Sequence, residues 1–188
     1  IVGATNGQTV TVTAGANCNS SFTLSLTITD SNGCSSTCNQ AVTVIDNSAP
    51  TWSSVAGSLD ITVTCSDAAG LAAAQALIPA AIDDCSSGLV PVKTAGSFVA
   101  GTCPQAGTYT NTWTVSDACG NAVGTVFTQV ITIIDDVAPT WTTIAGALNV
   151  TLSCEDATGL TAAQAMIPVA SDNCDVTLTP VKTSGNFV

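Results

Sequence analysis

An 89-residue period constrains this chain more than any other feature of its sequence. Residues 49–99 return as residues 138–188 without a gap, and 30 of the 51 aligned positions are identical. The identical positions include the segment Ala49-Pro50-Thr51-Trp52, the cysteines Cys65 and Cys85, and Pro91-Val92-Lys93-Thr94. A period of this length is typical of a tandem array of small domains, and it argues against a single catalytic core.

The period divides the sequence into three segments. Residues 48–137 are expected to form one complete repeat, and residues 138–188 the N-terminal part of the next. Residues 1–47 read as the C-terminal part of a preceding, divergent repeat. We therefore expect the chain to be a window of a longer polymer of repeats.

Alternation of apolar and polar residues predicts β-strands. Residues 59–65 and their copy 148–154 alternate in this way, and so do residues 108–116, where Tyr109, Trp113 and Val115 share one face. Residues 126–134 read as a further strand, joined to the one before by a turn at 116–121. The fold class is therefore all-β, with each repeat an antiparallel β-sandwich.

One segment of each repeat departs from the strand pattern. Residues 71–78 are rich in alanine and leucine, which favour a helix. Asp67 is placed to cap its N-terminus, and Pro79 is placed to end it. The copy runs from Asp156 to Pro168. We expect a short inserted helix in each repeat.

Composition excludes several classes of function. Two lysines stand against 13 carboxylates, for a net charge of −11, and histidine is absent. This balance excludes a nucleic-acid interface, which needs a basic face, and disfavours anionic membrane surfaces. No apolar run reaches transmembrane length, so no membrane insertion is expected in this segment. Without histidine the usual catalytic triads and most catalytic bases are missing, so we expect no enzyme.

Nine cysteines are a high number for 188 residues. Without histidine, a zinc site would need four thiolates, and no paired C-x-x-C motif is present. Cysteines that follow the repeat indicate a disulfide framework, and hence an extracellular or cell-surface location.

The sequence resembles a known class of repeat. Residues 112–121 (TWTVSDACGN) and 129–140 (QVITIIDDVAPT) resemble hyalin-repeat-like, immunoglobulin-like modules, which occur in tandem in large surface adhesins of Bacteroidetes-type bacteria. Residues 30–34 (DSNGC) look like the related PKD-like repeats of gliding adhesins. The resemblance covers the whole chain and implies adhesion, stalk and matrix roles. It carries no catalytic residues over to this sequence.

An immunoglobulin-like strand order predicts a disulfide pattern. Its second and sixth strands run the same way, which would bring Cys65 and Cys119 to one end of the sandwich and Cys85 and Cys103 to the other. The pairs Cys65–Cys119 and Cys85–Cys103 follow, and Cys65–Cys85 is the alternative. Cys154 and Cys174 are expected to pair with cysteines that follow Val188 in the longer chain. Cys18 and Cys34 likewise lack partners upstream in this sequence. Cys38 stays unassigned.

Several carboxylates lie at the boundary between one repeat and the next. Such groups could bind Ca²⁺ through oxygen ligands and stiffen the junction, with calcium as the cofactor. The alternative interpretation is a set of helix caps and turn aspartates, which need no metal. The candidate ligands are Asp46, Asp67, Asp117, Asp135, Asp136, Glu155 and Asp156.

Two sites match the pattern for N-linked glycosylation, Asn19 and Asn149, although this pattern often matches by chance. The sequence as a whole predicts a non-enzymatic extracellular rod, stalk or filament of an adhesin or matrix fibre. Its expected partners are neighbouring repeats or identical chains, with surface glycans or proteins as further candidates. Two alternatives stay open, a glycan-binding module and a spacer within a secreted hydrolase.

Overall fold

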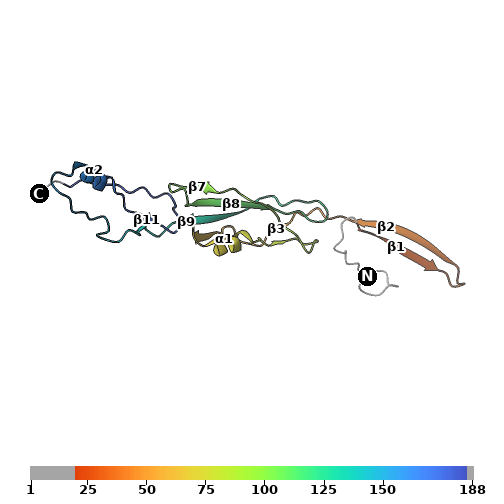
Figure 1. Ribbon diagram of the computed structural model, residues 1–188. Helices are drawn as coiled ribbons and strands as arrows, with labels where there is room; N and C mark the ends of the chain where they lie inside the picture. The colour runs from red at the N-terminus through yellow and green to blue at the C-terminus, as the bar shows by residue number, and fades with distance from the viewer. Residues whose placement is uncertain (1–19, 186–188) are drawn as a thin grey trace. The chain divides into compact units, whose positions relative to one another are not determined.

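The computed structural model describes residues 20–185, and its regular structure is mostly β-strand with two short helices (Figure 1). The all-β class predicted from the alternating pattern is therefore confirmed. Among the described residues, no helix has the length and apolar character needed to cross a membrane.

The N-terminal part of the described chain is a long hairpin. Strand β1 (Ser20–Thr29) pairs antiparallel with β2 (Ser35–Val44) in continuous register. The turn is built by Asp30, whose Oδ1 accepts hydrogen bonds from the backbone N–H groups of Asn32 and Cys34, both at 2.9 Å. Gly33 takes a φ of +87° in this turn, a conformation that glycine adopts without steric cost.

A five-stranded sheet follows, in the order β4-β9-β8-β6 with β7 also paired to β8. Strand β4 is parallel to β9, from Ile61 opposite Ile131 to Thr64 opposite Ile134. Strands β6 and β7 each pair antiparallel with β8. The strands are β4 (Ile61–Thr64), β6 (Val92–Thr94), β7 (Val99–Ala100), β8 (Gly107–Thr114) and β9 (Phe127–Ile134).

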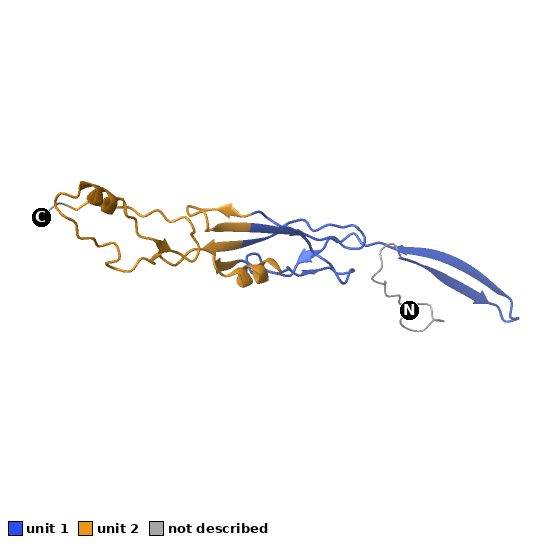
Figure 2. Cartoon of the chain, in the orientation of Figure 1, with its two compact units in different colours: residues 1–60, 77–97, 110–130 blue, residues 61–76, 98–109, 131–188 orange. Residues whose placement is uncertain are grey.

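The chain clusters into two compact units, coloured separately in Figure 2. Unit 1 comprises residues 1–60, 77–97 and 110–130, and unit 2 comprises residues 61–76, 98–109 and 131–188. Strands β8 and β9 each contribute to both units. The three segments derived from the sequence period stay a prediction.

Aromatic side chains form the core of unit 1. Trp113 is buried and meets the Phe127 ring edge-on, with the ring centroids 6.2 Å apart. Trp52 meets the same ring at 5.5 Å, and its indole N–H donates to the carbonyl of Thr125 at 2.8 Å. The Lys93 ammonium lies 5.3 Å from the centroid of the Trp113 ring, and desolvation there lowers the pKa of this lysine.

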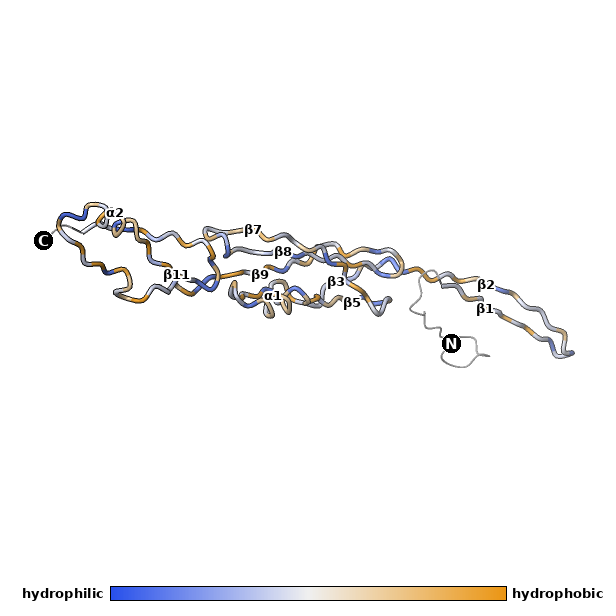
Figure 3. Tube along the Cα trace, in the orientation of Figure 1, coloured by the Kyte–Doolittle hydropathy of each residue, from blue (hydrophilic) through white to orange (hydrophobic). Residues whose placement is uncertain are grey.

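Aliphatic side chains form the core of unit 2. Val63 from β4 and Ile131 and Ile133 from β9 pack with Ala74 of helix α1. Because β4 and β9 are parallel neighbours, their inward-facing residues lie on one face of the sheet, and α1 (Ala68–Gln75) covers it. The hydropathy colouring of Figure 3 shows α1 as a mostly apolar segment.

Two amide side chains are fully buried inside unit 1. Asn111 of β8 donates from its amide nitrogen to Oε1 of Gln129 of β9 at 3.0 Å, and accepts a bond from the backbone N–H of Gly96. Gln129 donates in turn to the carbonyl of Leu59 at 2.8 Å. These bonds satisfy polar groups that would be costly to bury alone, and they tie two loops to the two long strands.

The two helices have the predicted caps. Asp67 lies at the N-cap of α1 and accepts from the backbone N–H of Gly70 at 2.8 Å. Asp156 caps α2 (Ala157–Ala165) through Gly159 at the same distance. The inserted helix predicted in each copy is therefore confirmed.

The second copy reproduces only part of the strand structure of the first. Strand β3 (Thr51–Trp52) pairs with β5 (Ala81–Ile82), and 89 residues later β10 (Thr140–Trp141) pairs with β11 (Ala170–Ser171) in the same register. The strand predicted at 148–154 does not form. A strand needs a hydrogen-bonded neighbour, and the equivalent segment, β4, has that neighbour in β9.

We predict that the buried amide pair makes a large contribution to stability. Asn111→Ala should lower the free energy of unfolding by about 1–3 kcal/mol, because it removes the buried hydrogen bonds that Asn111 makes with Gln129 and with the backbone N–H of Gly96. The matched control is Thr110→Ala, which removes an exposed side chain from the same strand and should change stability by less than about 0.5 kcal/mol. Urea denaturation of both variants measures the difference. Equal effects would contradict this role.

Candidate functional site

The candidate site is a cluster of two bonded cysteines and one aspartate in unit 2, which we call the stapled junction. Cys65 and Cys174 form a disulfide with a Cα–Cα distance of 5.7 Å, an ordinary value for this bond. A carboxylate oxygen of Asp135 lies within 4.8 Å of both sulfur atoms. The bond joins residues that are 109 positions apart, that is, one 89-residue period plus 20 residues.

Strand pairing brings Cys65 to this place. The backbone N–H of Cys65 donates to the carbonyl of Ile134 at 2.9 Å, so the parallel pairing of β4 with β9 continues one residue past the strand end. Asp135 is the next residue after β9. The end of β4 and the start of the second copy therefore lie together.

An aspartate turn presents Cys174. Oδ1 of Asp172 accepts hydrogen bonds from the backbone N–H groups of Cys174 at 2.8 Å and Asp175 at 3.0 Å. These two bonds lower the pKa of the Asp172 carboxyl, against the smaller effect of desolvation. Next to the disulfide, the side-chain amide of Asn173 donates to the hydroxyl of Ser66 at 3.4 Å.

A second cluster, in unit 1, repeats half of this arrangement. Asp46, Asp84 and Cys85 place ligand atoms within 4.8 Å of one another, and Cys85 is a free, exposed thiol. By the 89-residue period, Asp46 corresponds to Asp135 and Cys85 to Cys174. Desolvation and the neighbouring carboxylates of Asp46, Asp84 and Asp83 raise the pKa of the Cys85 thiol. We call this cluster the open junction.

The turn after β8 lies beside Asp46. Oδ1 of Asp117 accepts from the backbone N–H groups of Cys119 and Asn121, both at 2.8 Å, and Oδ2 accepts from the Asn121 amide at 2.7 Å. Desolvation by itself would raise the pKa of Asp117, but these bonds and one from Gly120 outweigh it and lower the pKa. Asn121 also donates to the backbone carbonyl of Asp46 at 3.1 Å.

The structure corrects the predicted disulfide pairs. Cys65 bonds with Cys174 and not with Cys119, and the alternative Cys65–Cys85 is excluded as well. Cys85 and Cys103 are free thiols rather than a pair. The expectation that Cys174 pairs beyond Val188 is also wrong.

The direction of β4 explains the error. Because β4 is parallel to β9, Cys65 lies beside the end of β9, whereas the Cys119 turn comes before β9 begins. An eight-residue strand spans about 26 Å, far more than a disulfide bridges. Cys119 is itself disulfide-bonded, and Cys34, Cys38 and Cys154 are free.

The candidate calcium ligands fall into different roles. Asp67 and Asp156 are helix caps, as the alternative interpretation holds. Asp46 and Asp117 lie together with the Cys119 sulfur. Asp135 faces the disulfide sulfurs, and Asp136 and Glu155 are exposed. A disulfide-bonded cysteine has no thiolate with which to bind a metal. At these clusters the possible calcium ligands are therefore the carboxylate oxygens. Calcium binding by Asp46 and Asp117 stays a prediction.

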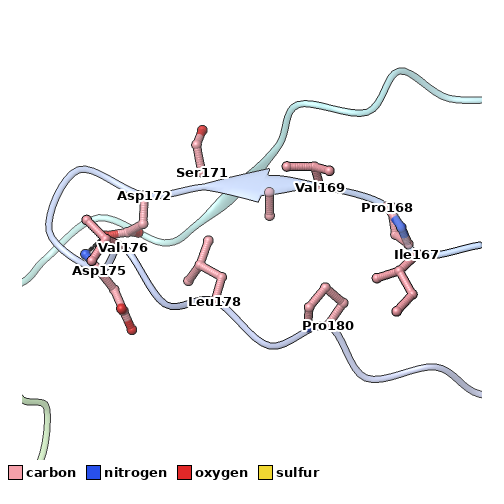
Figure 4. A pocket seen from close by; sticks show the side chains of 10 residues that line it. Ile167, Pro168, Val169, Ser171, Asp172, Asp175, Val176, Leu178 and Pro180 are labelled. Carbon is pink, nitrogen blue, oxygen red and sulfur yellow. Dashed lines mark hydrogen bonds between the residues drawn. The ribbon is translucent and has the colours of Figure 1, made fainter.

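A cavity of about 600 Å³ lies in the second copy (Figure 4). Its lining comes from both arms of the loop that carries Cys174. One arm contributes residues 167–172, and the other contributes Asp175, Val176, Leu178 and Pro180. An adjoining cavity of about 310 Å³ is bordered by Pro139 and Trp141.

The first copy shows what kind of surface lines these cavities. Pro50 and Pro79 are fully buried there, whereas their counterparts Pro139 and Pro168 are exposed and half-buried. Trp141 is 61% exposed, whereas its counterpart Trp52 packs on Phe127. The cavities are therefore lined by residues whose counterparts in the first copy belong to its core. This lining gives no indication of a ligand.

Of the two glycosylation candidates, Asn149 is exposed, and Asn19 lies outside the described residues. Sequence reasoning missed the partner of Cys65. The repeat itself held a signal for it, since the 109-residue separation equals one 89-residue period plus the 20 residues between Cys65 and Cys85.

We predict that peptide mapping without reductant will recover a Cys65–Cys174 linked pair. A protease that cleaves beside aspartate is required, because Asp135, Asp136 and Asp156 separate Cys119 from Cys174 in sequence. Recovery of a Cys65–Cys119 or Cys65–Cys85 peptide would contradict the pairing in the structure.

We also predict that acid weakens the turn that holds Cys174. The folded-state pKa of Asp172 is lowered, so its contribution to stability is complete above the unfolded value of about 3.9 and is lost as the pH falls through the folded value. Asp172→Asn keeps an oxygen acceptor but cannot titrate. Between pH 5 and pH 2 the wild type should therefore lose more stability than this variant. Asp136→Asn, which removes the same charge from an exposed position, is the control in thermal melts.

A scan against protein-family models finds no match to this chain, and a search of curated proteins finds none either.

Proposed function

We propose that this chain is a non-enzymatic structural segment of an extracellular repeat protein. In this proposal each 89-residue period is one immunoglobulin-like β-sandwich, and consecutive sandwiches form a rod, stalk or filament of a cell-surface adhesin or matrix fibre. The partners are neighbouring repeats and identical chains.

The disulfide between the two sequence copies carries the proposal. Cys65 belongs to the first copy and Cys174 to the second, so the disulfide joins residues on the two sides of the boundary between repeats. A bond in this position keeps the loop of the second copy that carries Cys174 attached to the end of β4 in the first. That is a mechanical role, and a disulfide framework of this kind persists in oxidising, extracellular settings.

The packing supports sandwich repeats. In β8, Asn111 and Trp113 are buried while Thr110 and Thr114 are exposed, and Val115, just after the strand, is buried as well. In β9, Phe127, Gln129, Ile131 and Ile133 are buried in the same alternation. One buried face and one exposed face on each long strand are typical of a sheet that packs as one layer of a sandwich.

The chemistry of the carboxylates supports a structural role rather than catalysis. Asp83 and Asp172, which precede Cys85 and Cys174, each hold a turn by accepting two backbone hydrogen bonds. Asp117 does the same after β8. An aspartate that already accepts these bonds is committed to the backbone, which is the use that turn aspartates serve in most proteins.

The proposal predicts that length grows with the number of repeats. Chains that carry one, two and three further copies of residues 49–137, one full period each, should increase in maximum dimension by one sandwich length per copy, on the order of 35–45 Å from strand rise plus loops. Small-angle X-ray scattering measures this. A maximum dimension that levels off as copies are added would reject the rod.

A further inference from the structure

A second cysteine of the complete repeat lies at the same end of the sheet as Cys65. Cys103 lies in the turn that joins β7 to β8. In this turn the backbone N–H of Ala106 donates to the carbonyl of Cys103 at 3.1 Å, and the N–H of Gly101 donates to the carbonyl of Ala106 at 2.7 Å. Cys103 is an exposed, free thiol.

Strand direction places the Cys103 turn near Cys65. Strands β8 and β9 are neighbours joined by a turn that contains an antiparallel bridge, so the start of β8 lies beside the end of β9. Cys65 is hydrogen-bonded beside that same end of β9. The rings of Phe98 and Tyr109, one on each arm of the Cys103 turn, have centroids 5.3 Å apart, and both pack on the core cluster that Cys65 also contacts.

Two other cysteines of the complete repeat lie at the open junction. Cys85 and Asp46 place ligand atoms within 4.8 Å of each other, and the Cys119 sulfur lies 3.7 Å from Oδ2 of Asp46. Asp46 comes just before the complete repeat in sequence. The repeat therefore brings these two cysteines to the junction before it, and it brings Cys65 and Cys103 to the junction after it.

One disulfide between two such sets is present in the structure. Cys65 bonds with Cys174, the counterpart of Cys85 in the second copy. Cys119 is also disulfide-bonded, and its partner is not among the cysteines of residues 20–185. Within the complete repeat, the positions of Cys103 and Cys119 are therefore the two left to pair across a junction. The free thiols of the described range are Cys34, Cys38, Cys85, Cys103 and Cys154.

The sequence gives Cys18 the place of Cys103 in the preceding, divergent repeat. Cys18 precedes Cys34 by 16 positions, as Cys103 precedes Cys119 by 16. Each of the two comes just before a long strand, β1 or β8, that leads into an aspartate turn. In both turns one aspartate oxygen accepts from the backbone N–H groups of the residues two and four positions later. Cys18 itself lies outside the described residues.

We propose that each junction of the array carries a second disulfide, between the Cys103 position of one repeat and the Cys119 position of the next. The proposal assigns Cys18 as the partner of Cys119, and it assigns Cys103 to the counterpart of Cys119 in the following repeat. It rests on the tandem organisation proposed above. Two bodies joined by one disulfide can rotate about it, whereas a second bond at a separate point opposes that rotation. The second disulfide therefore fixes the twist between consecutive repeats.

Formation of this bond needs an oxidant, which is a small-molecule disulfide such as oxidised glutathione. The Cys103 thiolate attacks it, forms a mixed disulfide and releases one glutathione thiolate. The thiolate at the Cys119 position of the next repeat then attacks the Cys103 sulfur and releases the other glutathione thiolate. The two protons lost by the cysteine thiols pass to the two glutathione thiolates. Two cysteines are oxidised, and one glutathione disulfide is reduced to two thiols.

The first test uses the 188-residue chain without substitutions. Free thiols are blocked with iodoacetamide in the folded protein, the chain is cleaved without reductant, and mass spectrometry identifies the linked peptides. We expect a Cys18–Cys119 pair in addition to Cys65–Cys174, with Cys103 alkylated. A free Cys119, or Cys119 bonded to any other cysteine, would overturn the proposal.

The second test adds a copy of residues 100–137 after Val188, which completes the second repeat and supplies a counterpart of Cys119. Serine replaces the cysteines that would give ambiguous peptides, namely Cys18, Cys34, Cys38, Cys119 and the added counterpart of Cys103. After oxidation in a glutathione buffer, we expect a peptide that links Cys103 to the added cysteine. Alkylation of Cys103 should fall at least about tenfold relative to the chain without the addition.

The matched control replaces the added cysteine with serine, and it should restore full alkylation of Cys103. The proposal is overturned if Cys103 stays reactive in extended chains whose Cys65–Cys174 bond has formed, or if it links to Cys85 or Cys154 instead. Scattering on multi-repeat chains that carry Cys103→Ser and Cys119→Ser tests the rod without the second disulfide. A failure of this bond is therefore distinguishable from a failure of the structural role.

Discussion

The parallel pairing of β4 with β9 is the constraint on which the rest of the structure depends. It places Val63 beside Ile131 and Ile133, so that one helix, α1, covers a common apolar face. It also sets Cys65 beside the end of β9, where Asp135 begins the passage into the second copy. The same backbone bonds that build the core of unit 2 therefore position the sulfur that joins the two copies.

Aspartate carboxylates hold several turns and cap both helices in the described part of the chain. Four turns are held by an aspartate oxygen that accepts two backbone hydrogen bonds, at Asp30, Asp83, Asp117 and Asp172. Two further aspartates cap the helices. An ionised carboxylate is a strong acceptor for backbone N–H groups, and it needs no packing partner beyond the turn itself.

The two junctions have a similar backbone structure, and they differ in whether the cysteine of the turn forms a disulfide. Each has an aspartate after a strand end, an aspartate turn and a cysteine presented by that turn. At the stapled junction the cysteine of the turn is bonded to Cys65 from the end of β4, whereas at the open junction Cys85 is a free thiol and the Cys119 sulfur lies near Asp46. The open junction shows that the turn exists without the disulfide, so the bond is added to a preformed local structure and is not its cause.

The sequence by itself determined the local elements. The strand pattern located β4, β8 and β9, the alanine-rich segments located both helices, and Asp67 and Asp156 marked their caps, because these signals depend on residues within one or two turns of each other. The same alternation places Asn111 and Gln129 on inward faces. Only the tertiary structure decided that these amides pair, that Cys65 bonds with Cys174, and that residues 148–154 form no strand. Each of these depends on which distant strand lies alongside, and strand direction is a property of pairing that local sequence does not encode.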